Sequence, residues 1–332
     1  MSKKILLGLL LLLSGLMTMF AEDVRRVRSG IIIVGSGDSV RAFEPFRSAL
    51  EGGLGYVDVV NKYKQTFGNA VNVYCMIIPT AVAIYCPEEA KNWTNDQCAM
   101  VRNVYAHLSV SVKAIDLFDV MATHVDEPIY SRTDHHWAPL GAYYAAQQFA
   151  TLAGLPFADL STYEEHVIHN YVGTMYHFSR DIAVKNAPED FVYYIPTNVD
   201  YTTTYIRYQL GKKRQVVREK DPVEGNFFYT FEDGSSAAYL TFMHGDVNTT
   251  KVKTSTHNGR RLLILKDSYG NALPAYLFHS FEEIHVVDCR YFKKNIVHYV
   301  QKNDITDILF ANNAIHAHSP ATHKSYNRYL EQ

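Results

Sequence analysis

Short apolar runs recur along the chain at a length typical of buried β-strands. Most are bounded by Gly, Asp or Asn residues, which interrupt regular structure. The runs predict strands at residues 30–34, 71–78, 112–118, 262–265, 284–287 and 308–310. Because they are apolar throughout rather than alternating, they favour strands that are buried on both faces, as in a parallel sheet.

Three segments between these strands carry apolar residues at the helical period. Residues 56–67 predict a helix that ends at Gly68, and residues 100–108 predict a second one. Pro139 begins a third segment and Gly154 ends it, which is the proline-first, glycine-last order of many helices. Strands alternating with helices predict an α/β domain whose parallel sheet is covered on both faces.

Residues 166–257 have a different pattern. They are rich in Tyr, Thr and Val, carry turn signals at EDG (232–234) and HGD (244–246), and show no helical period. This segment predicts a β-rich insertion beside the site. The segments on either side, 22–165 and 258–332, are expected to form one α/β domain.

The first 21 residues resemble a secretory signal peptide. Lys3 and Lys4 precede the apolar run 5–13, and small residues lead to Ala21. The run is shorter than the ~20 residues of a membrane-spanning helix. Cleavage after Ala21 would leave a periplasmic, cell-surface or secreted protein. An uncleaved anchor is the alternative, because Met19 is larger than the cleavage site prefers.

Charge and cysteine usage narrow the function classes. The 32 basic and 34 acidic residues nearly cancel and no basic run stands out, which argues against nucleic acid as a partner. Cys86 and Cys98 flank a polar stretch and predict a disulfide in an exported protein, whereas Cys75 and Cys289 lie in apolar runs. No pair of cysteines has the spacing of a structural zinc site, and no metal or cofactor is expected.

A candidate nucleophile follows the strand at 262–265. The run KDSYGN (266–271) places Ser268 where the strand ends, and Pro274 predicts a helix that begins near Asn271. Many α/β enzymes hold a nucleophile at such a strand-to-helix junction. The alternative is that Ser268 only caps the helix.

A candidate base lies in SRTDHHW (131–137), just before the Pro139 helix. Asp134 can hydrogen-bond one ring nitrogen of His136 and leave the other free to accept a proton. The alternative is a helix cap with packed histidines. Asp134, His136 and Ser268 together supply a Ser-His-Asp set, and sequence separation does not count against it because such sets are defined in space.

Two competing motifs deserve comparison. The run IIIVGSGDS (31–39) imitates the serine block of GDSL esterases and makes Ser39 a second candidate nucleophile. It lacks a following helix pattern, and no Asp-x-x-His block occurs near the C-terminus. Asp134-His135-His136 also imitates the metal motif of DHH phosphoesterases, but the other carboxylate motifs of that family are missing.

The motifs RTDHHW (132–137), GAYY (141–144), KDSYGN (266–271) and DCRYF (288–292) together resemble the DHHW family of exported bacterial proteins. That family is similar to the alginate O-acetyltransferases, whose domains are SGNH-hydrolase-like. The resemblance implies a three-layer sandwich with a parallel sheet. It also implies a circularly permuted motif order, since Asp134-x-His136 precedes Ser268.

The resemblance also implies further site residues. Asn313 or Asn312 would help the backbone N–H of Ser268 hold the oxyanion. Arg290 stands where SGNH enzymes usually place an oxyanion-hole glycine. Both Arg132 and Arg290 could support the site or bind an acidic sugar. The candidates for substrate contacts are Tyr269, Trp137 and His244, although core packing is the favoured interpretation of Trp137.

The leading hypothesis is a serine O-acyltransferase or O-acetylesterase that acts on an exported polysaccharide. Its partners would be a carbohydrate polymer and an acyl donor, and a membrane-bound acyl-transfer protein is one way to supply the acyl group. The alternative is a non-catalytic carbohydrate-binding or surface-assembly protein on an SGNH-like scaffold. The sequence leaves transfer or hydrolysis, the glycan and the oligomeric state open.

Overall fold

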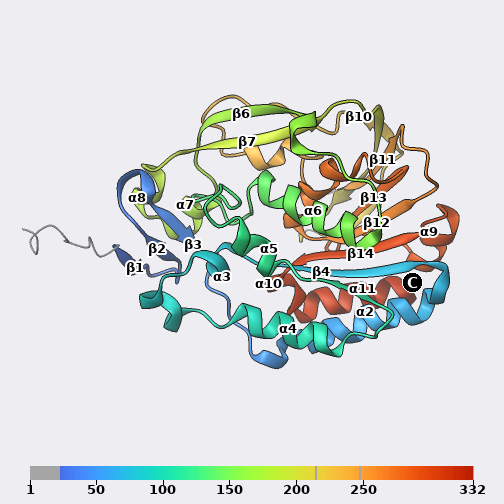
Figure 1. The fold of residues 1–332 in the computed structure, drawn as a ribbon, viewed down its shortest axis with the longest axis horizontal. Coiled ribbons are helices and arrows are strands. Elements are labelled where there is room, and N and C mark those ends of the chain that lie inside the picture. The colour runs from blue at the N-terminus through green and yellow to red at the C-terminus, as the bar shows by residue number, and fades with distance from the viewer. Residues whose placement is uncertain (1–22, 214, 247, 332) are drawn as a thin grey trace, which may run out of the picture.

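A nine-stranded mixed sheet forms the centre of the computed structural model (Figure 1). Its strands are β4 (Asn72–Ile78), β5 (Lys113–Ile115), β8 (Tyr201–Leu210), β9 (Val216–Glu219), β10 (Val223–Gly225), β11 (Asn248–Thr254), β12 (Arg261–Lys266), β13 (Glu283–Asp288) and β14 (Asp307–Asn313). Their order is β10-β8-β11-β13-β12-β14-β4-β5, and β9 also pairs with β8. The strands from β13 to β5 are parallel, as predicted, whereas β11, β8, β9 and β10 are antiparallel to their neighbours.

The structure describes residues 23–213, 215–246 and 248–331. The signal peptide predicted at 1–21 lies outside these residues. Within the described residues, no helix has the length and apolar character needed to cross a membrane.

Three helices lie where the apolar period predicts them: α2 (Leu54–Phe67), α4 (Gln97–His107) and α6 (Pro139–Ala153). Gly68 ends α2 with a φ of 55° and Gly154 ends α6 with a φ of 65°. This left-handed conformation is costly for residues with a Cβ atom, so glycine at these positions fixes where each helix stops.

The helices cover both faces of the sheet. In Figure 1, α2, α4 and α11 (Pro320–Glu331) lie below the sheet and α6 lies above it. On the lower face, the ring of Tyr63 from α2 packs against Phe310 of β14 with centroids 5.0 Å apart. On the upper face, Phe149 of α6 packs against Tyr74 of β4, also at 5.0 Å. Many of the tyrosines therefore serve as core residues, joining helices to the sheet.

The first predicted strand does not join the main sheet. β2 (Ile32–Val34) lies between β1 (Val24–Arg26) and β3 (Arg41–Phe43) in a separate antiparallel sheet. Gly35, at a φ of 84°, lies directly after β2, and the chain then returns antiparallel as β3 instead of crossing over through a helix. The expectation that this strand belongs to the parallel sheet is wrong.

The segment expected to be a helix after Ser268 is also different. It consists of two 3-10 segments, Ser268–Asn271 and Leu273–Leu277. The carboxylate of Asp267 accepts a hydrogen bond from the N–H of Tyr269 at 2.9 Å, which holds the first of these turns tight. Elsewhere, the strand expected at 112–118 is shorter than predicted, because α5 (Phe118–Thr123) begins at its last residue.

The segment 166–257 is rich in strands. β6 (Tyr163–Tyr171) and β7 (Glu189–Pro196) form a two-stranded ladder, while β8 and β11 extend the main sheet beside β13. It also holds the short helices α7 (Thr174–Ser179) and α8 (Ile182–Lys185), which are too short to give a helical period. The division of the chain into a domain and an insertion stays a prediction.

The structure contradicts the predicted disulfide. Cys86 and Cys98 are free thiols, although both line one surface pocket with Lys91 and Gln97. Burial raises the pKa of both thiols, which disfavours the reactive thiolate. The two cysteines flank a polar loop and line the same pocket, but their sulfur atoms are not bonded.

Candidate active site

Asp134, His136 and Ser268 form a continuous chain of hydrogen bonds. His136 Nε2 lies 2.8 Å from Ser268 Oγ, and His136 Nδ1 lies 2.6 Å from Asp134 Oδ1. An ionised carboxylate only accepts, so the proton is assigned to Nδ1, and Nε2 is left to accept the serine proton. The contact between His136 and Ser268 has the distance that the sequence interpretation requires, although the two residues are 132 positions apart.

The parallel sheet brings the two motifs together. Ser268 follows β12 at the carboxyl edge of the sheet and is the first residue of its 3-10 turn. Asp134 and His136 lie in the loop that leads into α6. Ser268 is half-buried and therefore keeps a path to solvent, whereas His136 is 6% exposed.

Asp267 anchors the serine turn to the neighbouring strand. Its fully buried carboxylate accepts hydrogen bonds from the N–H of Asn313 at 2.8 Å and from the side-chain amide of Asn312 at 3.2 Å. Together with the bond from Tyr269, these contacts tie the turn to the end of β14. The sequence interpretation missed this function because an Asp before a turn is usually only a cap.

The Asp134 carboxylate is buried and accepts four hydrogen bonds. Oδ1 accepts from the backbone N–H and ring of His136, and Oδ2 accepts from the N–H and hydroxyl of Thr174 at 2.8 and 2.7 Å. Burial alone would raise the pKa of Asp134, but the attraction of His136 and these hydrogen bonds hold it well below its usual value. The carboxylate is therefore charged at neutral pH and can stabilise an imidazolium.

His135 takes a separate position from His136. Its Nδ1 lies 2.5 Å from the hydroxyl oxygen of Thr174. Because the Thr174 hydroxyl donates its hydrogen bond to Asp134, Nδ1 of His135 is the donor to the Thr174 oxygen. Burial and the nearby His136 lower the pKa of His135 to about 3, which keeps its ring neutral. The centroids of the two rings lie 3.8 Å apart at an interplanar angle of 38°.

Gly173 makes room for this arrangement. A Cβ atom at this position would lie 2.4 Å from the Cβ of Asp134 and 2.5 Å from its Oδ2. Because atoms do not approach that closely, any larger residue would displace the carboxylate. Neither Gly173 nor Thr174 has a sequence signal, since both come from a loop far from the DHHW motif.

Tyr239 holds the imidazole and the serine turn in one geometry. Its ring stacks on His136 at 3.8 Å with an interplanar angle of 8°. Its hydroxyl donates to the carbonyl oxygens of Ser268 and Tyr269 at 3.1 and 2.9 Å. This tyrosine lies between the two sequence motifs and was not predicted.

A second network of charges lies beside the serine turn. Lys266, 2% exposed, pairs with Asp246 at 3.1 Å and with Asp288 at 2.9 Å. Arg290 pairs with the same two carboxylates at 2.8 and 2.7 Å. Arg290 therefore stabilises the neighbouring loops. Its backbone N–H, the group that an oxyanion-hole glycine would offer, donates to Asp288 Oδ1 at 2.9 Å.

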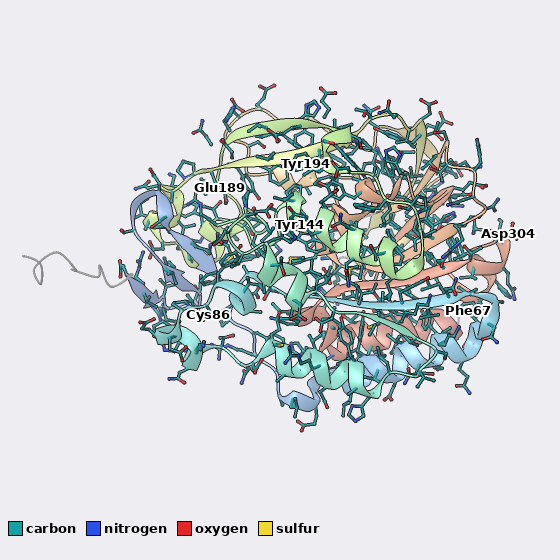
Figure 2. The ribbon with its side chains drawn as sticks, in the orientation of Figure 1. Phe67, Cys86, Tyr144, Glu189, Tyr194 and Asp304 are labelled. Carbon is teal, nitrogen blue, oxygen red and sulfur yellow. The ribbon has the colours of Figure 1, made fainter. Side chains whose placement is uncertain are left out.

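Arg132 has a similar structural function. Its guanidinium donates to the carbonyl oxygens of Val40 and Pro188 at 3.1 and 3.0 Å. Its backbone N–H and that of Thr133 donate to the carboxylate of Glu189, a residue labelled in Figure 2. Arg132 fixes the loop that carries Asp134 and is not free to bind an acidic sugar.

The two asparagines differ in what they can offer. Asn312 is fully buried, and its side-chain oxygen accepts from the hydroxyls of Tyr56 and Tyr326 while its amide donates to Asp267. Asn313 caps α10 (Ala314–Ala317) through its side-chain oxygen, and its amide makes only a 3.4 Å contact with Asp267. Of the two, Asn313 keeps the more available donor.

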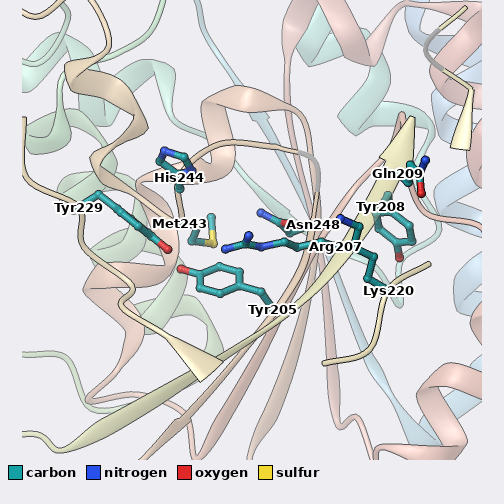
Figure 3. A pocket seen from close by; sticks show the side chains of 9 residues that line it. All are labelled: Tyr205, Arg207, Tyr208, Gln209, Lys220, Tyr229, Met243, His244 and Asn248. Atoms are coloured by element: carbon teal, nitrogen blue, oxygen red, sulfur yellow. The ribbon is translucent and has the colours of Figure 1, made fainter. Parts of the chain in front are cut away.

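The predicted substrate contacts divide three ways. Trp137 is fully buried and donates to the carbonyl of Tyr269, so it is a core residue and not part of a sugar cleft. Tyr269 is 1% exposed, and it borders a small pocket with Glu44 and His135. His244 is exposed and lines a different cavity, on the β8 side of the sheet (Figure 3).

The competing motifs receive less support. The hydroxyl of Ser39 bonds to the carbonyl of Ser36, and within the described residues no histidine is hydrogen-bonded to it. The possible metal ligands of Asp134, His135 and His136 lie within 4.8 Å of one another. Their closest atoms already hydrogen-bond to each other or to Thr174, so a metal would have to displace those bonds.

Thr174 supplies a matched test of this arrangement. Replacing it by Val keeps the shape but removes the hydroxyl, leaving His135 and one Asp134 oxygen without that partner. We expect Thr174→Val to lower the free energy of unfolding by about 1–3 kcal/mol in urea titrations. Thr174→Ser keeps the hydroxyl and should retain most of the stability. Equal losses in both variants would contradict the interpretation.

Asp134 also predicts a pH dependence. Its pKa is lower in the folded chain than in the unfolded chain, so acidification protonates the unfolded chain first. The stability from this carboxylate is complete above the unfolded value of about 4 and is lost as the pH falls toward the folded value. Between about pH 5 and 3, the free energy of unfolding should fall with pH less steeply in Asp134→Asn than in the wild type. The two slopes should differ by up to about 1.4 kcal/mol per pH unit. Urea unfolding at several pH values measures the two slopes, and identical slopes would refute the prediction.

The chain is similar to several known proteins. The model of the DHHW family, described as DHHW protein, matches residues 26–287. A crystal structure of a DHHW family protein from Eubacterium siraeum is 35% identical, covers 92% of this chain and 97% of that chain, and superposes with a TM-score of 0.82. No protein with a curated description matches the chain.

Bacillus cereus PatB1, a more distant relative, shares the fold. Bacillus cereus PatB1 with a sulfonyl adduct is 18% identical and has a TM-score of 0.69 over 88% of this chain and 96% of that chain. The O-acetyltransferase domain of Pseudomonas putida AlgJ is 14% identical, with a TM-score of 0.44 over 92% of this chain and 99% of that chain. The family model and the Eubacterium siraeum structure confirm the resemblance drawn from the sequence motifs: the chain belongs to the DHHW family.

Proposed function

We propose that the protein is a serine O-acyltransferase or O-acetylesterase that acts on carbohydrate esters. The hydrogen-bonded chain from Asp134 through His136 to Ser268 is the observation that carries the proposal. A half-buried serine whose hydroxyl meets an imidazole, itself held by a buried carboxylate, is the arrangement of an activated nucleophile.

The proton path follows from the hydrogen bonds. Ser268 Oγ attacks the carbonyl carbon of an ester while its proton passes to His136 Nε2. The tetrahedral intermediate expels the alcohol, which takes the proton from His136, and leaves an acyl group on Ser268. A sugar hydroxyl or a water then gives its proton to His136 and attacks the acyl carbon. When this second intermediate collapses, the bond to Ser268 Oγ breaks, Oγ takes the proton back from His136, and the product ester or acid is released. Asp134 stabilises the cation of His136 at both stages.

The negative oxygen of the intermediate needs donors. The backbone N–H of Ser268 begins a 3-10 turn and therefore has no partner within it. Asn313 is the second donor in this proposal, because its amide is held only loosely while that of Asn312 is committed to Asp267. Such donors are among the larger contributions to acyl-transfer catalysis.

The setting proposed for this chemistry extends beyond the described residues. Residues 1–21 would direct export of the enzyme and then be removed. The mature enzyme would lie in the periplasm, at the cell surface or in the medium, where polysaccharides are accessible. The chain would form one SGNH-hydrolase-like, three-layer domain from 22–165 and 258–332, with a permuted motif order and an insertion at 166–257. The acyl donor would come from a separate carrier or a membrane-bound partner.

Covalent labelling tests the nucleophile. A fluorophosphonate probe should label the wild-type chain at Ser268 and should fail to label Ser268→Ala. Ser39→Ala is the matched control, because Ser39 is the other candidate serine, and it should label like the wild type. His136→Ala should label about 10²–10⁴-fold more slowly, since it lacks the base.

A sulfonyl fluoride makes a suitable second probe, because Bacillus cereus PatB1 has been crystallised with a sulfonyl adduct. Peptide mapping by mass spectrometry locates the adduct. Labelling of Ser268→Ala at the wild-type rate would end the proposal. No labelling in any variant, combined with retained sugar binding, would favour the non-catalytic carbohydrate-binding protein.

Asn313 gives a separate prediction for the oxyanion. Asn313→Ser keeps a side-chain oxygen to cap α10 but removes the amide donor. We expect kcat for hydrolysis of an acetyl ester such as 4-nitrophenyl acetate to fall about 10²–10³-fold with little change in KM. The melting temperature checks that the fold is intact. Wild-type kcat in a folded Asn313→Ser would exclude this donor.

A further inference from the structure

A cavity of about 240 Å³ lies beside β8, away from the serine (Figure 3). We call it the Arg207 pocket, and its principal side chains are Tyr205, Arg207, Lys220, Tyr229 and His244. The proposed chemistry at Ser268 does not use it.

The sheet register places the Arg207 pocket on the same edge as Ser268. Paired residues cross four adjacent strands in one row, formed by Ile206, Thr249, Val287 and Leu265. The next residue of each strand toward the carboxyl edge is Arg207, Asn248, Asp288 or Lys266. Side chains alternate along each strand, so residues at the same level on neighbouring strands point to the same face of the sheet. Ser268 follows two residues after Lys266. With three strand spacings between β8 and β12, the pocket lies about 14 Å along the edge from the serine strand.

The pocket has a positive character. Arg207, Lys220 and His244 line it, and none of the lining residues in the described part of the chain carries a carboxylate. Arg207 is exposed, and no ion pair or side-chain hydrogen bond joins its guanidinium to another described residue. This differs from Arg132 and Arg290, whose guanidinium groups are committed to protein oxygens. An unpaired guanidinium in a concave site is a ready partner for a carboxylate or phosphate.

Aromatic rings form the walls around this charge. The ring of Tyr229 lies 4.7 Å from that of His244, and the Tyr205 hydroxyl donates to the carbonyl of Asn226 at 2.6 Å. Figure 3 shows the Arg207 side chain extending between Tyr205 and His244 in this view. Flat rings beside a fixed polar group suit a sugar ring, which has apolar faces and polar edges.

The loop that carries His244 is held in an uncommon conformation. Met243 and His244 have φ values of 57° and 52°, consecutive left-handed residues that are not glycine. Such residues are uncommon and persist where the surroundings hold them. Two residues later, Asp246 is fixed by Lys266 and Arg290 next to the serine turn. The loop therefore connects the Arg207 pocket to the strand that ends at Ser268.

We propose that the Arg207 pocket binds an acidic unit of the saccharide whose ester or hydroxyl group reaches Ser268. The inference rests on the proposed function and adds the substrate class: a glycan that bears an anionic group a short distance from the reacting position. Arg207 binds the anion, Lys220 adds positive charge, and the rings of Tyr229 and His244 contact the sugar. Carboxylate and phosphate sugars share this chemistry.

Calorimetric titration of the full chain carrying Ser268→Ala tests the inference without any reaction. The probes are a hexamer of galacturonic acid, the same hexamer with its carboxyl groups methyl-esterified, and glucose 6-phosphate. We expect an acidic probe to bind and the ester to bind at least about tenfold more weakly. Added salt should weaken the acidic probe, because exposed charges are screened. Binding by the hexamer assigns a carboxylate sugar, and binding by glucose 6-phosphate alone assigns a phosphate sugar.

Arg207→Gln should weaken the acidic probe about tenfold or more and leave the ester unchanged. Arg102→Gln is the matched control, because Arg102 is an exposed arginine on α4, on the far side of the sheet. Equal affinity for acid and ester would overturn the inference. So would equal binding in the two arginine variants, or no binding of either acidic probe. Failed covalent labelling would overturn only the proposed function, since binding is measured without the serine.

Discussion

The buried, ionised carboxylate of Asp134 constrains the site more than any other feature. Asp134 is 2% exposed, and its carboxylate has four hydrogen-bond donors. A buried carboxylate without partners would cost several kcal/mol, so each donor must stay in place for the fold to be stable. This explains why Thr174 and Gly173 matter although neither reaches Ser268. The same contacts that stabilise the charge also fix the orientation of His136.

The serine is positioned by a comparable arrangement on the opposite side of the imidazole. Asp267 ties its turn to β14, and Tyr239 joins the turn to the ring of His136 through its hydroxyl and its stacked face. The two halves of the site are thus held by separate buried carboxylates, and the reacting groups meet at the 2.8 Å contact between His136 and Ser268. Such preorganisation reduces the rearrangement that a reaction at the serine would require.

Charge is distributed unevenly along the carboxyl edge of the sheet. Next to the serine, Lys266 and Arg290 are neutralised by Asp246 and Asp288, so this part is a structural network. Farther along the edge, Arg207 has no such partner among the described residues. The contrast separates arginines that hold the protein together from one that is available to a ligand. Asp246 and His244 share one short loop, which makes the two regions parts of a single surface.

The sequence alone determined the elements whose signals are local. Pro139 and Gly154 set the limits of α6, the apolar run at 262–265 placed Ser268 at the end of a strand, and the two-residue spacing of Asp134 and His136 made their contact predictable. Only the tertiary structure decided which side chains surround them. Contacts from distant loops have no period or motif, so Thr174, Tyr239 and Arg207 gave no signal. Burial likewise depends on what packs from elsewhere in the chain, and the structure shows Trp137 fully buried, in agreement with core packing. The sequence spacing of Cys86 and Cys98 does not fix the relative positions of their sulfur atoms, and both are free thiols.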